Sequence, residues 1–224
     1  MERVHEGHRG RLKKRFMNEG LDSFEDHEVL ELLLFFCIPM KDTNALAHKM
    51  ISEFGTISGL FEASVTDICK RCKVTENTAT LVALIPSLSR RYQISKWGEK
   101  PRIETSTEAG ALALSVFSGR LYESFFVFSL DTQSRVNNIE LVHEGTINEV
   151  PVFPRIIVES ALRNHANSII IAHNHPSGVC SPSEADVEAT RKIKNALGAI
   201  SINVRDHIII AGENYFSFAE NNLI

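Results

Sequence analysis

The stretch IIIAHNHPSGVCSPSEADVEAT, residues 169–190, decides the fold of the second half of this chain. It opens with a run of branched apolar residues, which is typical of a buried strand, and then turns through Pro-Ser-Gly. The letters SPSE that follow predict the start of a helix, with Ser181 as N-cap and Glu184 closing a capping box. A strand that leads through a turn into a capped helix indicates an α/β unit.

Two histidines stand at the carboxyl end of this predicted strand, where open α/β sheets usually bind ligands. Residues two apart in a strand point to the same face, so His173 and His175 can both reach one ion. Asp186, which shares the helix face of Ser183, can supply an oxygen ligand. Two imidazoles and a carboxylate leave a fourth position for water, as in a catalytic zinc site. Such an ion lowers the pKa of water and generates a nucleophile.

The rest of the chain divides into two regions of different periodicity. Residues 1–95 show apolar spacings of three and four, which predict a small all-α domain. Residues 96–106 mix Gly, Pro and charge and predict a linker. Residues 107–224 alternate predicted helices and strands and predict an α/β domain. Its predicted strands include FFVFSLD, RVNNIELVH, GTINEVPVF and INVRDHIIIAG.

Composition excludes several classes of protein. The 224 residues are 43% hydrophobic and 23% charged, with no apolar run of membrane-spanning length and no signal-peptide pattern at the N-terminus. Four cysteines do not suggest a disulfide framework, so we expect a cytoplasmic protein without membrane contact. The net charge of -4 gives no broad basic field, although one basic cluster offers possible weak contact with DNA phosphates. It comprises Arg9, Arg11, Lys13, Lys14 and Arg15.

The motif around the histidines is similar to that of a known family. His173-x-His175 with Ser183 and Asp186 resembles the JAMM (MPN-type) metallopeptidase motif, and AHNHPSG followed by PS and D resembles its RadC-like branch. FFVFSLD, GTIN, a Pro-Arg pair before a helix and DHIII extend this resemblance over most of residues 105–220. It implies a cytidine-deaminase-like α/β fold, in which helices flank a central mixed sheet.

The resemblance also implies a set of roles. One zinc ion per chain would be bound by His173, His175 and Asp186, and Ser183 would help to polarise the scissile carbonyl. A glutamate on an early strand would act as general base, for which Glu123 is the first candidate and Glu144 the competitor. The implied activity is hydrolysis of a peptide or isopeptide bond in a protein or peptide substrate.

The helical region is similar to the N-terminal part of RadC-like proteins through GHRGRLKKRF, DHEVLELLL and EFGTISGL. That resemblance implies a helix-hairpin-helix-like domain, although the expected second hairpin reads CKVTENTA and lacks glycine. The resemblance of the helical region leaves an alternative function: a DNA-associated, repair-linked interaction protein whose metal site is structural or serves another hydrolysis. The sequence does not determine the oligomeric state.

Other metal-binding side chains carry less weight. The CKRC pair at residues 69–72 has helical spacing, so we expect both thiols to face a helical core. Cys180 lies inside the motif loop and is expected to be a bystander. His207 is expected to be a strand histidine with local partners, and Asp206 is a candidate for orienting a metal ligand.

Overall fold

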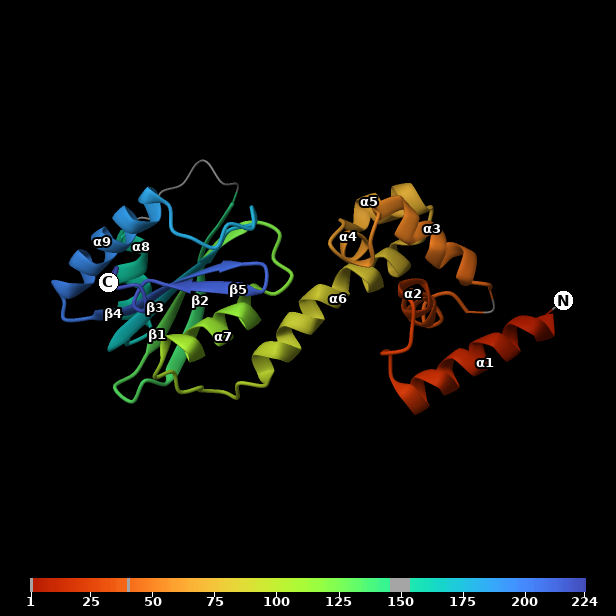
Figure 1. The fold of residues 1–224 in the computed structure, drawn as a ribbon, viewed down its shortest axis with the longest axis horizontal. Coiled ribbons are helices and arrows are strands. Elements are labelled where there is room, and N and C mark those ends of the chain that lie inside the picture. Colours follow the sequence, from red (N-terminus) through yellow and green to blue (C-terminus); the bar gives the residue numbers. More distant parts are fainter. Residues whose placement is uncertain (1, 40, 146–153) are drawn as a thin grey trace. The chain divides into compact units, whose positions relative to one another are not determined.

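The computed structural model describes residues 2–39, 41–145 and 154–224. Contacts divide the chain into two compact units, residues 1–88 and 89–224, which Figure 1 shows in ribbon form. The division falls inside helix α6 (Glu76–Ser95) and so precedes the linker that was predicted at residues 96–106.

The first unit is all-α, as predicted. Its core is formed by apolar side chains from several helices, among them Leu30, Met50, Leu60, Ile68 and Val82. No helix in the described part of the chain is both long and apolar enough to cross a membrane. The helices that precede α6 are α1 (Glu2–Glu19), α2 (Asp26–Leu34), α3 (Asn44–Phe54), α4 (Ile57–Phe61) and α5 (Val65–Cys72).

The second unit contains a five-stranded mixed sheet with strand order β2-β1-β3-β4-β5, which confirms the predicted fold class. Strands β3 and β4 are parallel, and the other neighbours are antiparallel. The parallel pair requires a crossover, which helix α9 (Glu184–Gly198) provides. The strands are β1 (Glu123–Leu130), β2 (Val136–Gly145), β3 (Ser168–Asn174), β4 (Asn203–Ala211) and β5 (Asn214–Ser217).

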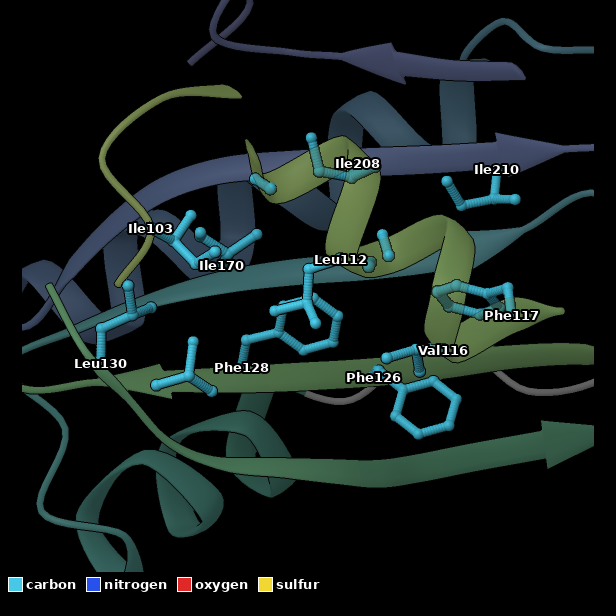
Figure 2. Close-up of a cluster of buried hydrophobic side chains, with 14 residues drawn as sticks. Ile103, Leu112, Val116, Phe117, Phe126, Phe128, Leu130, Ile170, Ile208 and Ile210 are labelled. Carbon is cyan, nitrogen blue, oxygen red and sulfur yellow. The ribbon is translucent and has the colours of Figure 1, made fainter. Parts of the chain in front are cut away.

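Helices cover both faces of this sheet (Figure 1). Helix α7 (Ser106–Phe117) packs on one face over Phe126, Phe128, Ile170 and Ile208, as Figure 2 shows. The second core lies on the opposite face under α8 (Pro154–Arg163) and α9, and it contains Phe125, Val127, Ile169 and Ile171. Successive strand residues alternate between the two faces of the sheet. Ile169 and Ile171 lie in the core under α8 and α9, so the next β3 residues at the same two-residue spacing also face α9.

Part of the predicted linker belongs to the α/β unit. Ile103 is 1% exposed and lies in the core under α7. Its backbone N–H donates to Ser134 O at 2.9 Å, and Arg205 donates to its carbonyl at 3.0 Å. The strand predicted for GTINEVPVF falls mainly on residues 146–153, which lie outside the described residues.

The approach of α7 to β5 yields a first prediction. A Cβ atom added at Gly110 would lie 2.7 Å from the ring of Tyr215, which is closer than van der Waals contact allows. Gly110→Ala should therefore lower the free energy of unfolding by about 1–3 kcal/mol, because overpacking displaces the helix. Urea denaturation followed by the fluorescence of Trp97, the only tryptophan, measures this change because Trp97 packs against the core under α7.

Gly198→Ala is the matched control, because a Cβ atom at this end of α9 meets nothing within 4 Å. This control should leave the free energy of unfolding unchanged or raise it by up to about 1 kcal/mol. Equal unfolding energies for Gly110→Ala and the wild type would contradict the close packing of α7 on β5.

Candidate metal centre

Three potential ligand side chains converge at the carboxyl end of β3. His173 is in the strand, His175 follows it, and Asp186 lies in the first turn of α9. His173 Nε2 lies 2.9 Å from His175 Nε2 and 3.2 Å from Asp186 Oδ1, and His175 Nε2 lies 3.5 Å from Asp186 Oδ2. Within the described ranges this is the only cluster of three or more His, Cys, Asp or Glu side chains suited to a metal ion. The predicted ligand residues are thus brought together.

The spacing of these atoms fits a small four-coordinate ion. Ligands about 2.0–2.1 Å from a zinc ion in tetrahedral geometry lie about 3.3 Å from one another. The two distances from His173 Nε2, 2.9 Å to His175 Nε2 and 3.2 Å to Asp186 Oδ1, lie just below this value, and His175 Nε2 lies 3.5 Å from the second carboxylate oxygen. The His173 side chain is 1% exposed, whereas those of His175 and Asp186 are 16% and 17% exposed. The site therefore has a buried floor and a side that solvent or a substrate can reach.

Electrostatics favours a cation at this position. Burial by itself raises the pKa of Asp186, but hydrogen bonds with His173 and His175 outweigh it and hold that pKa well below its ordinary range. The hydrogen bond with Asp186 is also the main reason that the pKa of His175 is raised. An ionised carboxylate held between two imidazoles supplies the negative charge that a divalent cation needs.

The helix that carries Asp186 begins later than predicted. Ser183, not Ser181, is the N-cap, and α9 starts at Glu184. The capping box joins Ser183 to Asp186: Asp186 N–H donates to Ser183 Oγ at 3.2 Å, and Ser183 N–H donates to Asp186 Oδ2 at 2.7 Å. Both serines have an acidic residue three positions later, so the pattern alone did not select between them. The contact of Asp186 with the histidines favours the later start.

Hydrogen bonds at the far side of each ring orient the two histidines. His175 Nδ1 lies 2.9 Å from the carbonyl oxygen of Val179, which only accepts, so Nδ1 carries hydrogen and Nε2 faces the other ligands. His173 Nδ1 lies 2.7 Å from His207 Nε2. The Phe125 ring is stacked on His173 with a centroid separation of 5.7 Å and an interplanar angle of 9°. Both imidazoles are thus held before any ion binds.

Strand register places Glu123 on the face that carries these ligands. Phe125 lies opposite His173 in the β1–β3 pair, and both face α9. Glu123 is two residues before Phe125 in the same strand, so it points to the same face. The raised pKa of His175, caused mainly by Asp186, also contains a smaller contribution from the charge of Glu123.

Glu144 lies on the other face. It is opposite Ser124 in the β1–β2 pair, and Ser124 alternates with Glu123 along β1. Its carboxylate accepts a hydrogen bond from Arg120 at 2.9 Å, and the Arg120 guanidinium lies over the ring of Phe126 in the core under α7. Of the two candidate bases, the structure brings only Glu123 to the side of the histidines.

Asn174, between the two histidines, was not predicted to have a role. Its side-chain oxygen accepts from Ser124 N–H at 2.8 Å, and its side-chain nitrogen donates to Tyr122 O at 3.1 Å. These two backbone groups flank Glu123, so the Asn174 amide holds the strand on both sides of the carboxylate. The sequence signal for this role is the position of Asn174 between two ligands in a strand. Side chains alternate along a strand, so Asn174 cannot point the same way as the two histidines and is available to bond the neighbouring strand.

Other predicted positions lie away from the ligands. The Asp206 carboxylate contacts none of the three ligand side chains in the described part of the chain: it accepts from Ser106 Oγ at 2.6 Å, from Ser217 Oγ at 2.7 Å and from the backbone N–H of His207 at 2.7 Å. The prediction that Asp206 orients a ligand directly is wrong, because Asp206 lies opposite Ile170 on the face of the sheet that α7 covers. The Cys180 thiol donates to Ile209 O at 3.8 Å, and burial raises its pKa. The CKRC thiols, at residues 69–72, pack in or against the helical core, as expected.

The basic cluster is partly engaged within the helical unit. Arg9 donates to the carbonyl oxygens of Ile38 and Lys41. Arg15 forms an ion pair with Glu28 at 2.8 Å. Among the side chains that the structure describes, which in this helix begin at residue 7, no ion pair is formed by Arg11, Lys13 or Lys14. Weak DNA contact by this cluster stays a prediction.

A helix-flanked mixed sheet with this donor set at a strand end defines a JAB (MPN-type) domain. Residues 103–223 match the family described as RadC-like JAB domain. The chain therefore belongs to the RadC-like family, and this confirms the predicted resemblance and relates the chain to JAMM-type hydrolases.

Similarity to named relatives covers nearly the whole chain. A UPF0758 protein of Fusobacterium nucleatum is 33% identical, over 100% of this chain and 99% of the relative. A UPF0758 protein of Pseudoalteromonas translucida is 37% identical, over 96% of each chain. A UPF0758 protein of Vibrio atlanticus is 30% identical, over 95% of each chain. The helical unit is therefore shared with these relatives as well.

The corrected helix start yields a second prediction. Ser183→Ala removes the N-cap and a hydrogen bond of 2.6 Å from Ser183 Oγ to Asp186 Oδ2. It should lower the free energy of unfolding by about 1 kcal/mol and weaken metal binding about tenfold or more, because Asp186 loses its orientation. Urea denaturation and competition with a chromophoric zinc chelator measure the two effects. Ser181→Ala is the control and should leave the free energy of unfolding and the zinc affinity unchanged. A larger effect of Ser181→Ala than of Ser183→Ala would indicate that Ser181 is the N-cap after all.

Proposed function

We propose that this chain is a zinc-dependent hydrolase that cleaves a peptide or isopeptide bond in a protein or peptide substrate. The observation that carries the proposal is the convergence of His173 Nε2, His175 Nε2 and the Asp186 carboxylate on one place that retains an accessible side. Structural zinc sites are usually closed by four protein ligands, whereas three ligands and an open position are typical of catalysis.

The chemistry of the donor set supports zinc as the ion. Two imidazole nitrogens and one carboxylate oxygen suit zinc and related transition metals, whereas magnesium and calcium prefer oxygen ligands. No cysteine belongs to the cluster among the described residues, and this argues against a closed thiolate site. When bound, zinc supplies Lewis acidity that lowers the pKa of water and polarises a carbonyl.

Glu123 is proposed as the general base. Its position at the start of β1, on the ligand side of the sheet, suits a group that accepts a proton from water and then delivers it to the leaving amine. The carboxylate of Asp186 and the two imidazoles would hold the ion, which leaves Glu123 as the group for proton transfer. Asn174 limits the movement of the backbone around Glu123 through its two hydrogen bonds.

Ser183 is proposed to assist at the carbonyl oxygen of the substrate. In the structure its hydroxyl donates to Asp186 Oδ2 at 2.6 Å while its oxygen accepts from Asp186 N–H. A hydrogen bond to the substrate therefore requires the hydroxyl to turn away from Asp186. Binding of Asp186 to a cation would weaken the pull of its carboxylate on that hydrogen and favour this exchange.

The base assignment yields a third prediction. Full-length protein loaded with zinc should hydrolyse at least one member of a panel of isopeptide-linked and linear peptide substrates, and a chelator should abolish this activity. Glu123→Gln should bind zinc as tightly as the wild type but lower kcat about 100- to 10,000-fold, because it removes proton transfer. Glu144→Gln, on the other face, should retain activity. Chelator-resistant hydrolysis, or full activity in Glu123→Gln, would contradict the proposal.

A further inference from the structure

Behind His173 lies a hydrogen-bonded chain that joins three elements of the α/β unit. Thr190 Oγ1, on α9, lies 2.6 Å from Asp186 O and 2.6 Å from His207 Nδ1. His207 Nε2, on β4, lies 2.7 Å from His173 Nδ1, on β3. Thr190, His207 and His173 are only 1–2% exposed, so water does not compete for these bonds. We call Thr190 and His207 the relay.

The direction of each hydrogen in this chain follows from donor and acceptor chemistry. The Asp186 carbonyl oxygen can only accept, so the single hydroxyl hydrogen of Thr190 points to it. Thr190 Oγ1 must then accept from His207, which places a hydrogen on His207 Nδ1. His207 is 1% exposed, and its ring nitrogens face Thr190 Oγ1 and His173 Nδ1 rather than a carboxylate. A buried charge without an acidic partner is costly, so this imidazole is neutral and its Nε2 has a free lone pair.

The last link defines the state of the metal-facing ring. Because His207 Nε2 accepts, His173 Nδ1 must donate and carries the ring hydrogen. With a hydrogen fixed on Nδ1, Nε2, which faces His175 and Asp186, is the ring nitrogen left to bind a metal ion in place of its own hydrogen. The opposite tautomer of His207 would put the hydrogen of His173 on Nε2, between the ring and the ion.

We infer that Thr190 and His207 are positioning residues that lock His173 in its metal-binding tautomer and tie it to the backbone of Asp186. Neither belongs to the converging ligand cluster, and the inference rests on the proposed function only in taking that cluster as a zinc site. Ring stacking holds the planes of both imidazoles, so the tautomer is the main property of the hydrogen-bonded chain that remains to be fixed. Phe218 stacks on His207 at a centroid distance of 4.5 Å, just as Phe125 stacks on His173.

The test compares Thr190→Val with Thr190→Ser in the full-length chain. Valine keeps the branched shape but removes the hydroxyl, so His207 Nδ1–H loses its acceptor and the tautomer is no longer fixed. Thr190→Val should raise the zinc dissociation constant about 10- to 100-fold, as removal of an outer partner of a metal-bound histidine does. Thr190→Ser keeps the hydroxyl and should bind zinc as the wild type does. Competition with a chromophoric chelator measures the dissociation constants.

A second measurement keeps the inference falsifiable if Thr190→Val does not fold. Nitrogen-15 resonances of the imidazole rings in the zinc-loaded wild type should show hydrogen on Nδ1 of both His207 and His173. Hydrogen on His207 Nε2 would overturn the inference, as would a folded Thr190→Val protein that binds zinc as tightly as the wild type. In the latter case the wild type still binds zinc and the proposed function stands. A wild type that binds no zinc would overturn the proposed function and the relay together.

Discussion

The contact between the Asp186 carboxylate and the two imidazoles at the end of β3 is the interaction on which the site depends. Oδ1 faces His173 at 3.2 Å, while Oδ2 faces His175 at 3.5 Å and accepts from the Ser183 hydroxyl at 2.6 Å. The same side chain is the third residue of α9 and closes its capping box. One carboxylate therefore joins the start of the helix to the place where the potential metal ligands meet.

The mixed sheet makes this contact possible by sorting side chains between two faces. Along β1 and β3, alternate residues fill the core under α7 or the core under α8 and α9. The residues that face α8 and α9 are followed along the two strands, at the same two-residue spacing, by Glu123 and His173. The potential base and the buried ligand therefore share a face. The parallel β3–β4 pair places His207 behind His173, and α9 crosses between these strands and brings both Asp186 and Thr190.

The sequence predicted the features that are encoded locally. Branched apolar runs identified the strands, and the His-x-His spacing with a later Ser-x-x-Asp identified the ligand cluster that the structure brings together. The helix start was misplaced because Ser181 and Ser183 both precede an acidic residue at the capping distance. The choice between Glu123 and Glu144 depended on a strand register with a bulge after Phe125, which no local pattern determines. Thr190 and His207 lie on different elements, so only the folded chain joins them.

Zinc content of the full-length chain tests the central claim most directly. After loading with zinc and removal of free metal by gel filtration, inductively coupled plasma mass spectrometry should find about one zinc ion per wild-type chain. His173→Ala and Asp186→Ala, each of which removes one of the converging ligands, should retain almost none. Zinc content equal to that of the wild type in both variants would contradict the account.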